Sequence, residues 1–306
     1  MPVISQTLHY TAFGLRLASE IALPELVPAA GGKGRADVDI RREDLSQGWA
    51  ACGAGERNHV CRDGEFWLHI PGVAIYRVRQ GNRIDFSPLP GATETAIRLY
   101  LLGTCMGALL LQRRIYPLHG SAVVIDGNAY AIVGDSGAGK STLAAVLLGR
   151  GHLLLSDDVI PVSLSGDGSP VVIPAYPQQK LWEESLEPLG LNGTRYQPLH
   201  ESKYAIPVSS RFCPRPVPLA GVFELVKTEG NDVEMVSLDG LERLHALQVH
   251  TFRPMLVARM GVEAWHFAVA ARMAGQIRMY QLRRPAKRFS AHELAARILD
   301  AASGQR

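Results

Sequence analysis

The sequence is poor in cysteine, with four in 306 residues, and it lacks any Cys-x-x-Cys pair or zinc-finger spacing of histidines. We therefore expect neither a structural metal site nor a disulfide framework, and the composition is typical of a reducing, cytoplasmic compartment. The longest mostly apolar run, residues 99–111, is shorter than the roughly 20 residues of a membrane-spanning helix. Residues 1–6 also lack the basic and apolar regions of a secretory signal.

An excess of charge of one sign is missing as well. The chain has 32 Lys and Arg against 29 Asp and Glu, which leaves a net charge of +3. This balance gives no electrostatic reason to expect a nucleic acid or a membrane surface as partner. Hydrophobic residues make up 47% of the chain, so a large core can form and global disorder is excluded.

The first part of the chain predicts short strands separated by turns. Residues 65–70 and 73–78 are aromatic and β-branched runs on either side of Pro71-Gly72, which predicts a hairpin. We expect a β-rich N-terminal module over residues 1–90.

The rest of the chain, residues 91–306, predicts a second domain. It opens with an apolar helix over residues 96–113, which we expect to be buried. Ser290 and Glu293 have the spacing of a capping box, which predicts the start of a C-terminal helix.

The strongest indication of a function is a predicted phosphate-binding loop. Residues 134–141 match G-x-x-x-x-G-K-[ST] between a predicted strand and a predicted helix, a context that a chance match among 30 glycines would rarely have. The glycines let backbone N–H groups face phosphate oxygens, and the helix N-terminus adds its dipole. Lys140 can reach the β- and γ-phosphates, and Ser141 can bind Mg²⁺. The phosphate-binding residues that we predict are Gly134, Asp135, Ser136, Gly137, Ala138, Gly139, Lys140, Ser141 and Thr142.

The strand before this loop has a predicted antiparallel neighbour. Asp126-Gly127 lies between the β-rich runs 121–125 and 128–133, and Asp-Gly between such runs is a strong hairpin signal. The loop is therefore expected in a sheet that is at least partly antiparallel.

Two adjacent acids follow the loop. Residues 152–158 predict an apolar strand that ends in Asp157 and Asp158, and a strand–helix–strand crossover would bring both near the phosphates. One acid could bind the metal while the other accepts a proton from an attacking hydroxyl. A solvated turn or a helix cap is the alternative. His119 precedes the hairpin and could also lie near the γ-phosphate, although a lone histidine is commonly structural.

Residues 118–162 resemble the HPr kinase/phosphorylase family. The resemblance rests on His119-Gly120, on Gly-Asp-Ser-Gly-x-Gly-Lys-Ser at 134–141, on Arg150-Gly151-His152 and on Asp157-Asp158. In that family the phosphate loop lies in a largely antiparallel sheet. The resemblance thus implies an α/β fold with a mixed, largely antiparallel sheet, beside the β-rich N-terminal module.

The resemblance also implies a role for each matching residue. Lys140 and Ser141 would bind phosphate and Mg²⁺, and Asp158 would help to hold the metal. Asp157 would accept the proton of a serine hydroxyl, and His119 would assist at the transferred phosphoryl group. Thr142 stands where the family usually has an acid. The chain has no counterpart of the Glu-Ile-Arg-Gly signature tied to phosphorylase activity, which leaves the reverse reaction open.

Other segments are similar to the HPr-kinase-like enzymes of lasso-peptide biosynthesis, which phosphorylate a serine of a ribosomally made precursor peptide. These segments are residues 13–26, Tyr176-Pro177, Lys180-Leu181-Trp182 and Glu201-Ser202-Lys203-Tyr204. Lys203 and Arg211 are the cations that we expect over the phosphates, with solvated loop charges as the alternative.

The sequence thus predicts a Mg²⁺-dependent kinase that transfers the γ-phosphoryl group of ATP to a serine of a peptide or small protein. ATP as the donor and a homo-oligomeric state follow from the resemblance alone. Two alternatives stay open: a small-molecule kinase on the same core, and a nucleotide-binding regulator without transfer activity. We expect residues 1–90 to dock the acceptor, unless they only cover the helix at 96–113.

Overall fold

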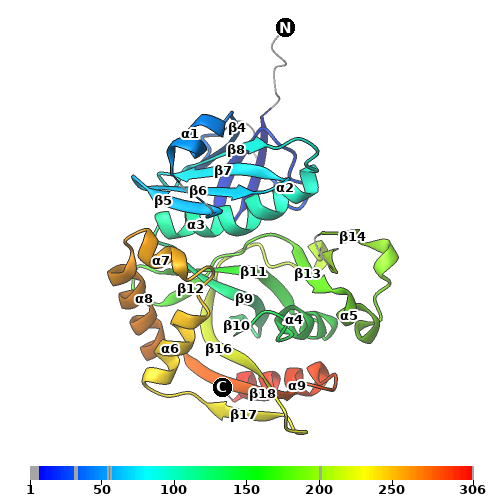
Figure 1. The fold of residues 1–306 in the computed structure, drawn as a ribbon. Coiled ribbons are helices and arrows are strands. Elements are labelled where there is room, and N and C mark those ends of the chain that lie inside the picture. Colours follow the sequence, from blue (N-terminus) through cyan, green and yellow to red (C-terminus); the bar gives the residue numbers. More distant parts are fainter. Residues whose placement is uncertain (1–6, 31–33, 54, 56, 200–201, 305–306) are drawn as a thin grey trace. The chain divides into compact units, whose positions relative to one another are not determined.

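A computed structural model of the chain describes residues 7–30, 34–53, 55, 57–199 and 202–304. Two compact units are present, the first made of Met1–Ile115 and Met255–Glu263 and the second of Tyr116–Pro254 and Ala264–Arg306 (Figure 1). Each contains helices and strands, which confirms the predicted α/β class. The secretory-signal prediction for residues 1–6 and the similarity at Glu201 fall outside the described residues.

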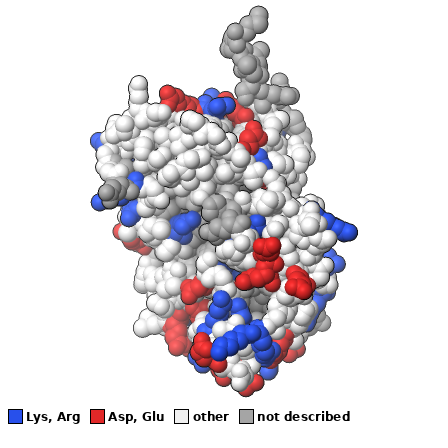
Figure 2. Space-filling view, turned by 45° about the vertical axis from the view of Figure 1, so that its right-hand side comes forward, with Lys and Arg blue, Asp and Glu red and all other residues white. Residues whose placement is uncertain are grey.

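Charged side chains of both signs share the surface. On the face shown in Figure 2, Lys and Arg lie interspersed with Asp and Glu, in line with the net charge of +3.

The first unit is built on an eight-stranded sheet with the order β3-β1-β2-β4-β8-β7-β6-β5. Its strands are β1 Leu8–Ala12, β2 Leu15–Ser19, β3 Val27–Pro28, β4 Val38–Arg42, β5 His59–Arg62, β6 Glu65–Ile70, β7 Ala74–Arg79 and β8 Arg83–Pro88, with helix α1 at Ser46–Ala51. Strand β4 pairs in parallel with β2 and β8, and the other pairs are antiparallel. The predicted hairpin is confirmed as β6 and β7, in which Glu65 lies opposite Arg79.

A helical segment packs on this sheet within the first unit. It consists of α2 Glu94–Tyr100, the π-helical stretch η1 Leu101–Cys105 and α3 Met106–Gln112. It begins at Thr93, whose Oγ1 accepts a hydrogen bond from the backbone N–H of Ala96 at 3.2 Å. The Tyr76 hydroxyl donates to the Ile97 carbonyl at 3.0 Å and so joins the helix to β7. By length and composition alone, the helical segment Glu94–Gln112 could cross a membrane. However, 72% of its most apolar 18-residue stretch is buried, and buried core helices of soluble proteins have the same length and composition.

This helical segment belongs with the sheet that it covers, so the first compact unit extends to Ile115. Helix α7 (Met255–Arg259) belongs to the same unit. The boundary that we predicted after residue 90, between a module at 1–90 and a domain at 91–306, stays a prediction.

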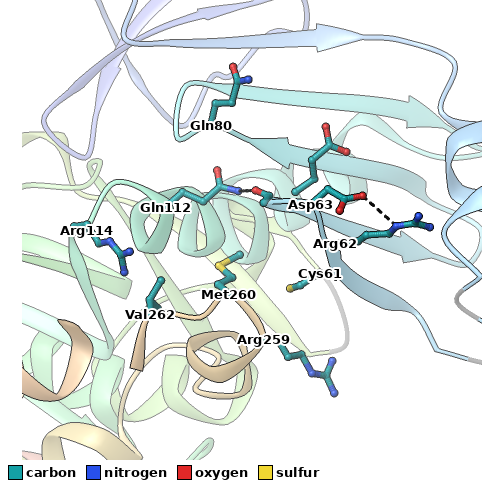
Figure 3. A pocket seen from close by; sticks show the side chains of 11 residues that line it. Cys61, Arg62, Asp63, Gln80, Gln112, Arg114, Arg259, Met260 and Val262 are labelled. Atoms are coloured by element: carbon teal, nitrogen blue, oxygen red, sulfur yellow. Dashed lines mark hydrogen bonds and ion pairs between the residues drawn. The ribbon is translucent and has the colours of Figure 1, made fainter. Parts of the chain in front are cut away.

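The first unit has a pocket beside its edge strand β5 (Figure 3). The pocket has a volume of about 390 Å³ and is lined by Cys61, Arg62, Asp63, Gly64, Glu65, Gln80, Gln112, Arg114, Arg259, Met260 and Val262. Arg62 and Asp63 form an ion pair at its rim, with 3.1 Å between Nε and Oδ2. Gln112 donates from Nε2 to the Gly64 carbonyl at 3.0 Å.

The second unit is built on a seven-stranded mixed sheet. Its strands are β9 Tyr116–Ile125, β10 Asn128–Gly134, β11 Leu153–Leu164, β12 Pro170–Val172, β16 Val217–Thr228, β17 Glu234–Ser237 and β18 Arg278–Pro285. The order is β10-β9-β11-β12-β16-β18-β17, and β10 pairs with β16 as well. The β10–β16 and β16–β18 pairs are parallel and the other pairs are antiparallel. The predicted mixed, largely antiparallel sheet is therefore confirmed.

Helices cover both faces of this sheet. Helices α4 (Lys140–Gly149) and α9 (Ala291–Ser303) pack their apolar residues into one core. Helices α6 (Leu241–Val249) and α8 (Glu263–Gln276) contribute to a second core, which contains Leu247, Ala270 and Met273. The second unit also has a three-stranded sheet with the order β13-β15-β14, formed by β13 Gln178–Trp182, β15 Lys203–Pro207 and β14 Gln197–Pro198. Helix α5 (Glu183–Leu186) directly follows β13 in the sequence.

The predicted hairpin before the phosphate loop is confirmed by β9 and β10. Asp126 and Gly127 both have positive φ angles, 49° and 81°, as the favoured two-residue hairpin turn requires. The predicted capping box at Ser290 is wrong. Helix α9 does begin after Ser290, but the Ser290 φ and ψ angles of −126° and 10° do not have the extended geometry of a side-chain cap. Its hydroxyl makes no cap bond, and Glu293 pairs with Arg288 instead.

Candidate active site

Residues 134–141 form a loop between β10 and α4, as the sequence predicted. Gly134 lies so close to β16 that a Cβ there would be 2.5 Å from the Leu225 carbonyl oxygen, and its φ angle is +142°. Gly139, with a φ angle of +103°, occupies the N-cap position of α4. Only glycine adopts these two positions without strain. The loop can therefore turn its N–H groups toward a phosphate at the helix N-terminus.

Lys140 is the first residue of α4 and is almost fully buried. Its Nζ donates to the carbonyl oxygens of Gly134 and Asp135, both at 2.8 Å. Burial lowers the pKa of Lys140, and the charges of Asp157 and Asp158 oppose this shift. The ammonium is therefore held inside the loop, where it could also donate hydrogen bonds to the oxygens of a bound phosphate.

The predicted acids and the loop line one pocket in the second unit. Its lining residues are His119, Gly120, Ser136, Gly137, Gly139, Lys140, Ser141, Thr142, Asp157, Asp158, Lys180, Trp182 and Lys203. These residues come from β9, the loop, α4, β11, β13 and β15. The structure thus brings together elements that are far apart in the sequence.

Asp157 is buried and both of its carboxylate oxygens accept hydrogen bonds. Oδ1 accepts from the Ser121 hydroxyl at 2.5 Å, and Oδ2 accepts from the Lys180 backbone N–H at 2.7 Å. Burial raises the pKa of Asp157 above its usual range, although these two hydrogen bonds partly oppose the shift. A carboxylate with a raised pKa is suited to accept a proton from a hydroxyl group.

Asp158 has the opposite electrostatic setting. Burial alone would raise its pKa, but the Lys180 ammonium, 2.7 Å from Oδ2, holds the pKa well below its usual range. Its φ angle is +73°, a strained value for a residue other than glycine. Asp158 is therefore an ionised carboxylate fixed at the pocket wall.

The position of the acids differs from the prediction. Asp157 and Asp158 lie in the middle of the long strand β11 rather than at its end, and β9 lies between β10 and β11. The register places Asp157 opposite Ser121 and Asp158 opposite Gly120, with an irregularity between Leu154 and Ser156. Strands β10 and β11 run in the same direction, since each is antiparallel to β9, and α4 connects them, so the predicted crossover is present with β9 between its two strands.

His119 lies next to Asp158 in the pocket. Its Nδ1 is 3.0 Å from the Asp158 carbonyl oxygen. A carbonyl can only accept, so Nδ1 carries the hydrogen and Nε2 is an acceptor in the neutral ring. Burial and the charge of Lys140 lower the pKa of His119, so the ring is neutral at pH 7. Phe252 packs against it, with the ring centroids 5.8 Å apart.

The remaining predicted residues have different positions. Lys203 lines the pocket, with its ammonium 4.3 Å from the centroid of the Trp182 ring. Arg211 lies in an exposed 3₁₀ turn and is not among the pocket residues, so its contact with phosphate stays a prediction. Thr142 lines the pocket, and its hydroxyl is 2.8 Å from that of Ser185 on α5.

Three further residues touch the site without having been assigned a role from the sequence. Ser121 and Lys180 bind the acids, and Arg284 on β18 donates from Nε to the Ala138 carbonyl of the loop at 2.8 Å. Lys180 was noted only as part of a similar segment. No local pattern identifies these residues, because each contact depends on which strands are neighbours.

The oxygen donors in the pocket fit Mg²⁺, which is commonly held by one or two carboxylates together with substrate phosphates. The Ser141 hydroxyl and the ionised Asp158 both line the pocket. The described part of the chain has no cluster of three or more His, Cys, Asp or Glu side chains suited to a metal. Ser141 and Asp158 would therefore hold the ion jointly with nucleotide phosphates, whose charge the ion would neutralise.

Comparisons with known proteins support the family resemblance over part of the chain. The HPr kinase/phosphorylase of Mycoplasmopsis pulmonis is 43% identical over 68 residues, 22% of each chain. That of Chlorobium phaeobacteroides is 43% identical over 99 residues, 29% of each chain. That of Paraburkholderia phymatum is 34% identical over 91 residues, 29% of this chain and 26% of the relative. The matches thus span about a quarter of the length of these relatives. No family model matches the chain.

A solved structure, the HPr(Ser) kinase/phosphatase from Coxiella burnetii, aligns with 18% identity and a TM-score of 0.33. The alignment covers 62% of this chain and 95% of that chain. The curated relatives confirm the HPr-kinase-like resemblance that the motifs predicted.

Proposed function

We propose that this chain is a kinase that transfers the γ-phosphoryl group of ATP to a serine hydroxyl of a peptide or small protein. One observation carries the proposal. The phosphate loop with Lys140 lines the same pocket as Asp157, Asp158 and His119, so a γ-phosphate bound in the loop lies beside a proton acceptor. The similarity to HPr kinase/phosphorylases supports it.

The reaction assigns each residue a separate task. The serine oxygen attacks the γ-phosphorus, a new O–P bond forms, and the bond between that phosphorus and the β–γ bridging oxygen breaks. Asp157 accepts the serine proton, which its raised pKa favours. Lys140 and the loop N–H groups stabilise the negative charge on the phosphates and on the departing ADP. His119 lines the same pocket, where the resemblance assigns it an assisting role at the transferred phosphoryl group.

Asp158 is assigned to Mg²⁺ rather than to the proton. Lys180 keeps it ionised, and an ionised carboxylate is a good ligand for a hard cation. Ser141 supplies the second protein oxygen. The two neighbouring acids therefore differ in role because their surroundings shift their pKa values in opposite directions.

The acceptor that we propose is a ribosomally made precursor peptide of the lasso type. Support comes from the segments that resemble the lasso-peptide kinases, because Lys180, Trp182 and Lys203 within them line the pocket. ATP as the donor and a homo-oligomeric state are part of the same proposal and rest on the resemblance, and the proposed cytoplasmic location rests on the cysteine-poor composition.

The test is a transfer assay with γ-labelled ATP. The chain is incubated with serine-containing peptides, with the same peptides carrying alanine for serine, and with a metabolite mixture. We expect label on serine peptides alone, and no transfer by Asp157→Asn. Label on a metabolite would favour the small-molecule kinase, and binding of ATP without any transfer would favour the regulator.

A further inference from the structure

Two cations flank the phosphate loop on the side away from the acids. Lys227 and Arg284 lie opposite each other near the carboxyl ends of the parallel strands β16 and β18. Strand β16 is also the parallel neighbour of β10, with Leu225 opposite Gly134 at the start of the loop. Ligands of parallel sheets bind at the carboxyl ends of strands, so these two side chains stand where a ligand of the loop would extend.

Arg284 contacts the loop, and Lys227 lies close to it. Arg284 donates from Nε to the Ala138 carbonyl at 2.8 Å, and its Nη2 is 3.7 Å from the position that a Cβ at Gly139 would take. The Lys227 Nζ is 3.8 Å from the corresponding position at Gly137. The ammonium and the guanidinium therefore lie beside the glycine-rich turn.

The strand ends that carry these cations are held together. The Thr228 hydroxyl donates to the Arg284 carbonyl at 3.3 Å, and the Ala286 N–H donates to the Thr228 carbonyl at 2.9 Å. Within the described ranges, neither cation forms an ion pair with a carboxylate. Lys227 is exposed, so its charge is open to an anion beside the loop.

The orientation of a bound nucleotide follows from the strands on the two sides of β10, which are β9 on one side and β16 on the other. On one flank, β9 and β11 carry His119, Asp157 and Asp158, where the transferred phosphoryl group must lie. The phosphate chain passes through the loop, and its other end must leave toward the opposite flank, where β16 and β18 end. We propose that Lys227 and Arg284 form the subsite for the 5′ end of the donor nucleoside, that is, its α-phosphate and the adjoining sugar. This inference rests on the proposed function.

Lys227→Gln tests the subsite, because Lys227 is exposed and its replacement leaves the Arg284 contact with Ala138 in place. Calorimetry would measure the Kd values of ATP, ADP and inorganic pyrophosphate in the presence of Mg²⁺. Because Lys227 is exposed, the loss of its contact should weaken ATP and ADP less than the loss of a buried charge-assisted contact would, by about 3- to 10-fold. Pyrophosphate fills only the part of the loop that takes the β- and γ-phosphates, so its affinity should not change.

Arg278→Gln is the matched control, since it removes one positive charge from the opposite end of β18. It should leave all three Kd values unchanged. Equal weakening of pyrophosphate and ATP by Lys227→Gln, or no weakening of either, would overturn the subsite. Lys140→Ala distinguishes a failure of the subsite proposal from a failure of the proposed function. It should weaken pyrophosphate as well as ATP, and if it weakens neither, the proposed function itself fails.

Discussion

Lys180 binds both acids of the candidate site with two different groups. Its ammonium donates to Asp158 Oδ2 at 2.7 Å, and its backbone N–H donates to Asp157 Oδ2, also at 2.7 Å. A single residue of β13 therefore fixes the adjacent carboxylates of β11, but its ammonium donates its hydrogen bond to Asp158, whereas Asp157 receives only the backbone N–H. The different protonation behaviour of two neighbouring aspartates follows from this arrangement.

The Lys180–Asp158 pair should contribute to stability in a pH-dependent way. The side chains are 11% and 25% exposed, so Lys180→Met should cost about 2 kcal/mol, below the ~3–5 kcal/mol of a fully buried pair. The pKa of Asp158 is lowered from its usual 3.8 in the folded state. The stabilisation is therefore present above pH 3.8 and is lost as the pH falls further. Urea unfolding of both proteins between pH 7 and pH 3 measures the difference, which should shrink at the acid end. A constant difference would contradict the ion-pair explanation.

The adjacent acids should respond differently to the same substitution. Asp157→Asn should leave binding of ATP with Mg²⁺ nearly intact and reduce transfer by about 10²- to 10⁴-fold, because it removes the proton acceptor. Asp158→Asn should raise the Mg²⁺ concentration needed for half-maximal rate. Calorimetry and Mg²⁺ titrations of the rate distinguish the two variants. Identical behaviour of both would show that the division of roles is wrong, even if the site is correctly located.

Lys140→Ala should weaken ATP binding and abolish turnover while the fold persists. The ammonium is the buried cation of the phosphate loop, and the loss of a charge-assisted contact of about 1.5–3 kcal/mol corresponds to about 10- to 100-fold in Kd. Calorimetry measures the affinity, and circular dichroism checks the fold. An unchanged ATP titration would rule out the phosphate-loop interpretation.

Substitutions of Lys203 and Arg211 can be compared directly, because each removes one positive charge. Lys203 lines the pocket, whereas Arg211 is exposed in a turn outside it. Lys203→Gln should lower kcat/KM about tenfold, since one charge-assisted contact with phosphate or acceptor is lost. Arg211→Gln should have a smaller effect, measured in the same transfer assay. An equal or larger effect of Arg211→Gln would support the sequence prediction that both residues contact the phosphates.

The docking role of the N-terminal module can be tested at its edge strand. Arg62 lies in β5 and lines the pocket of Figure 3, and exposed strand edges can bind extended peptides. Arg62→Glu should raise the peptide KM several-fold and leave kcat and the basal ATPase rate unchanged, because uniform binding energy is lost. Arg41→Glu, on the interior strand β4, is the control. If substitutions along every strand leave the KM unchanged, the module only covers its helix.

The features that the sequence predicted correctly depend on neighbouring residues. The loop at 134–141 needs glycine where φ is positive or a Cβ would clash, and Asp126-Gly127 supplies two residues for a turn with positive φ. Both requirements can be recognised from the types of a few consecutive residues. The presence of Asp157 and Asp158 near the loop was also predicted, since both follow it closely.

The features that could not be predicted depend on strand pairing. Ser121 reaches Asp157 because β9 lies beside β11, and Lys180 reaches Asp158 because β13 packs against β11. Nothing in either local sequence reveals these neighbours. The capping box at Ser290 failed because a cap depends on the backbone dihedral angles of Ser290 as well as on the residue types, and these angles are not extended.

The segment Met255–Glu263 has a consequence for how the protein is made. The chain leaves the first unit at Ile115 and returns to it only for this segment, whose Leu256, Val257 and Val262 are buried. On the ribosome the first unit therefore stays incomplete until residue 263 has emerged, long after the phosphate loop has been synthesised. A chain cut at residue 115 would therefore lack one segment of its own compact unit, and the remaining piece would carry a segment that belongs to the other.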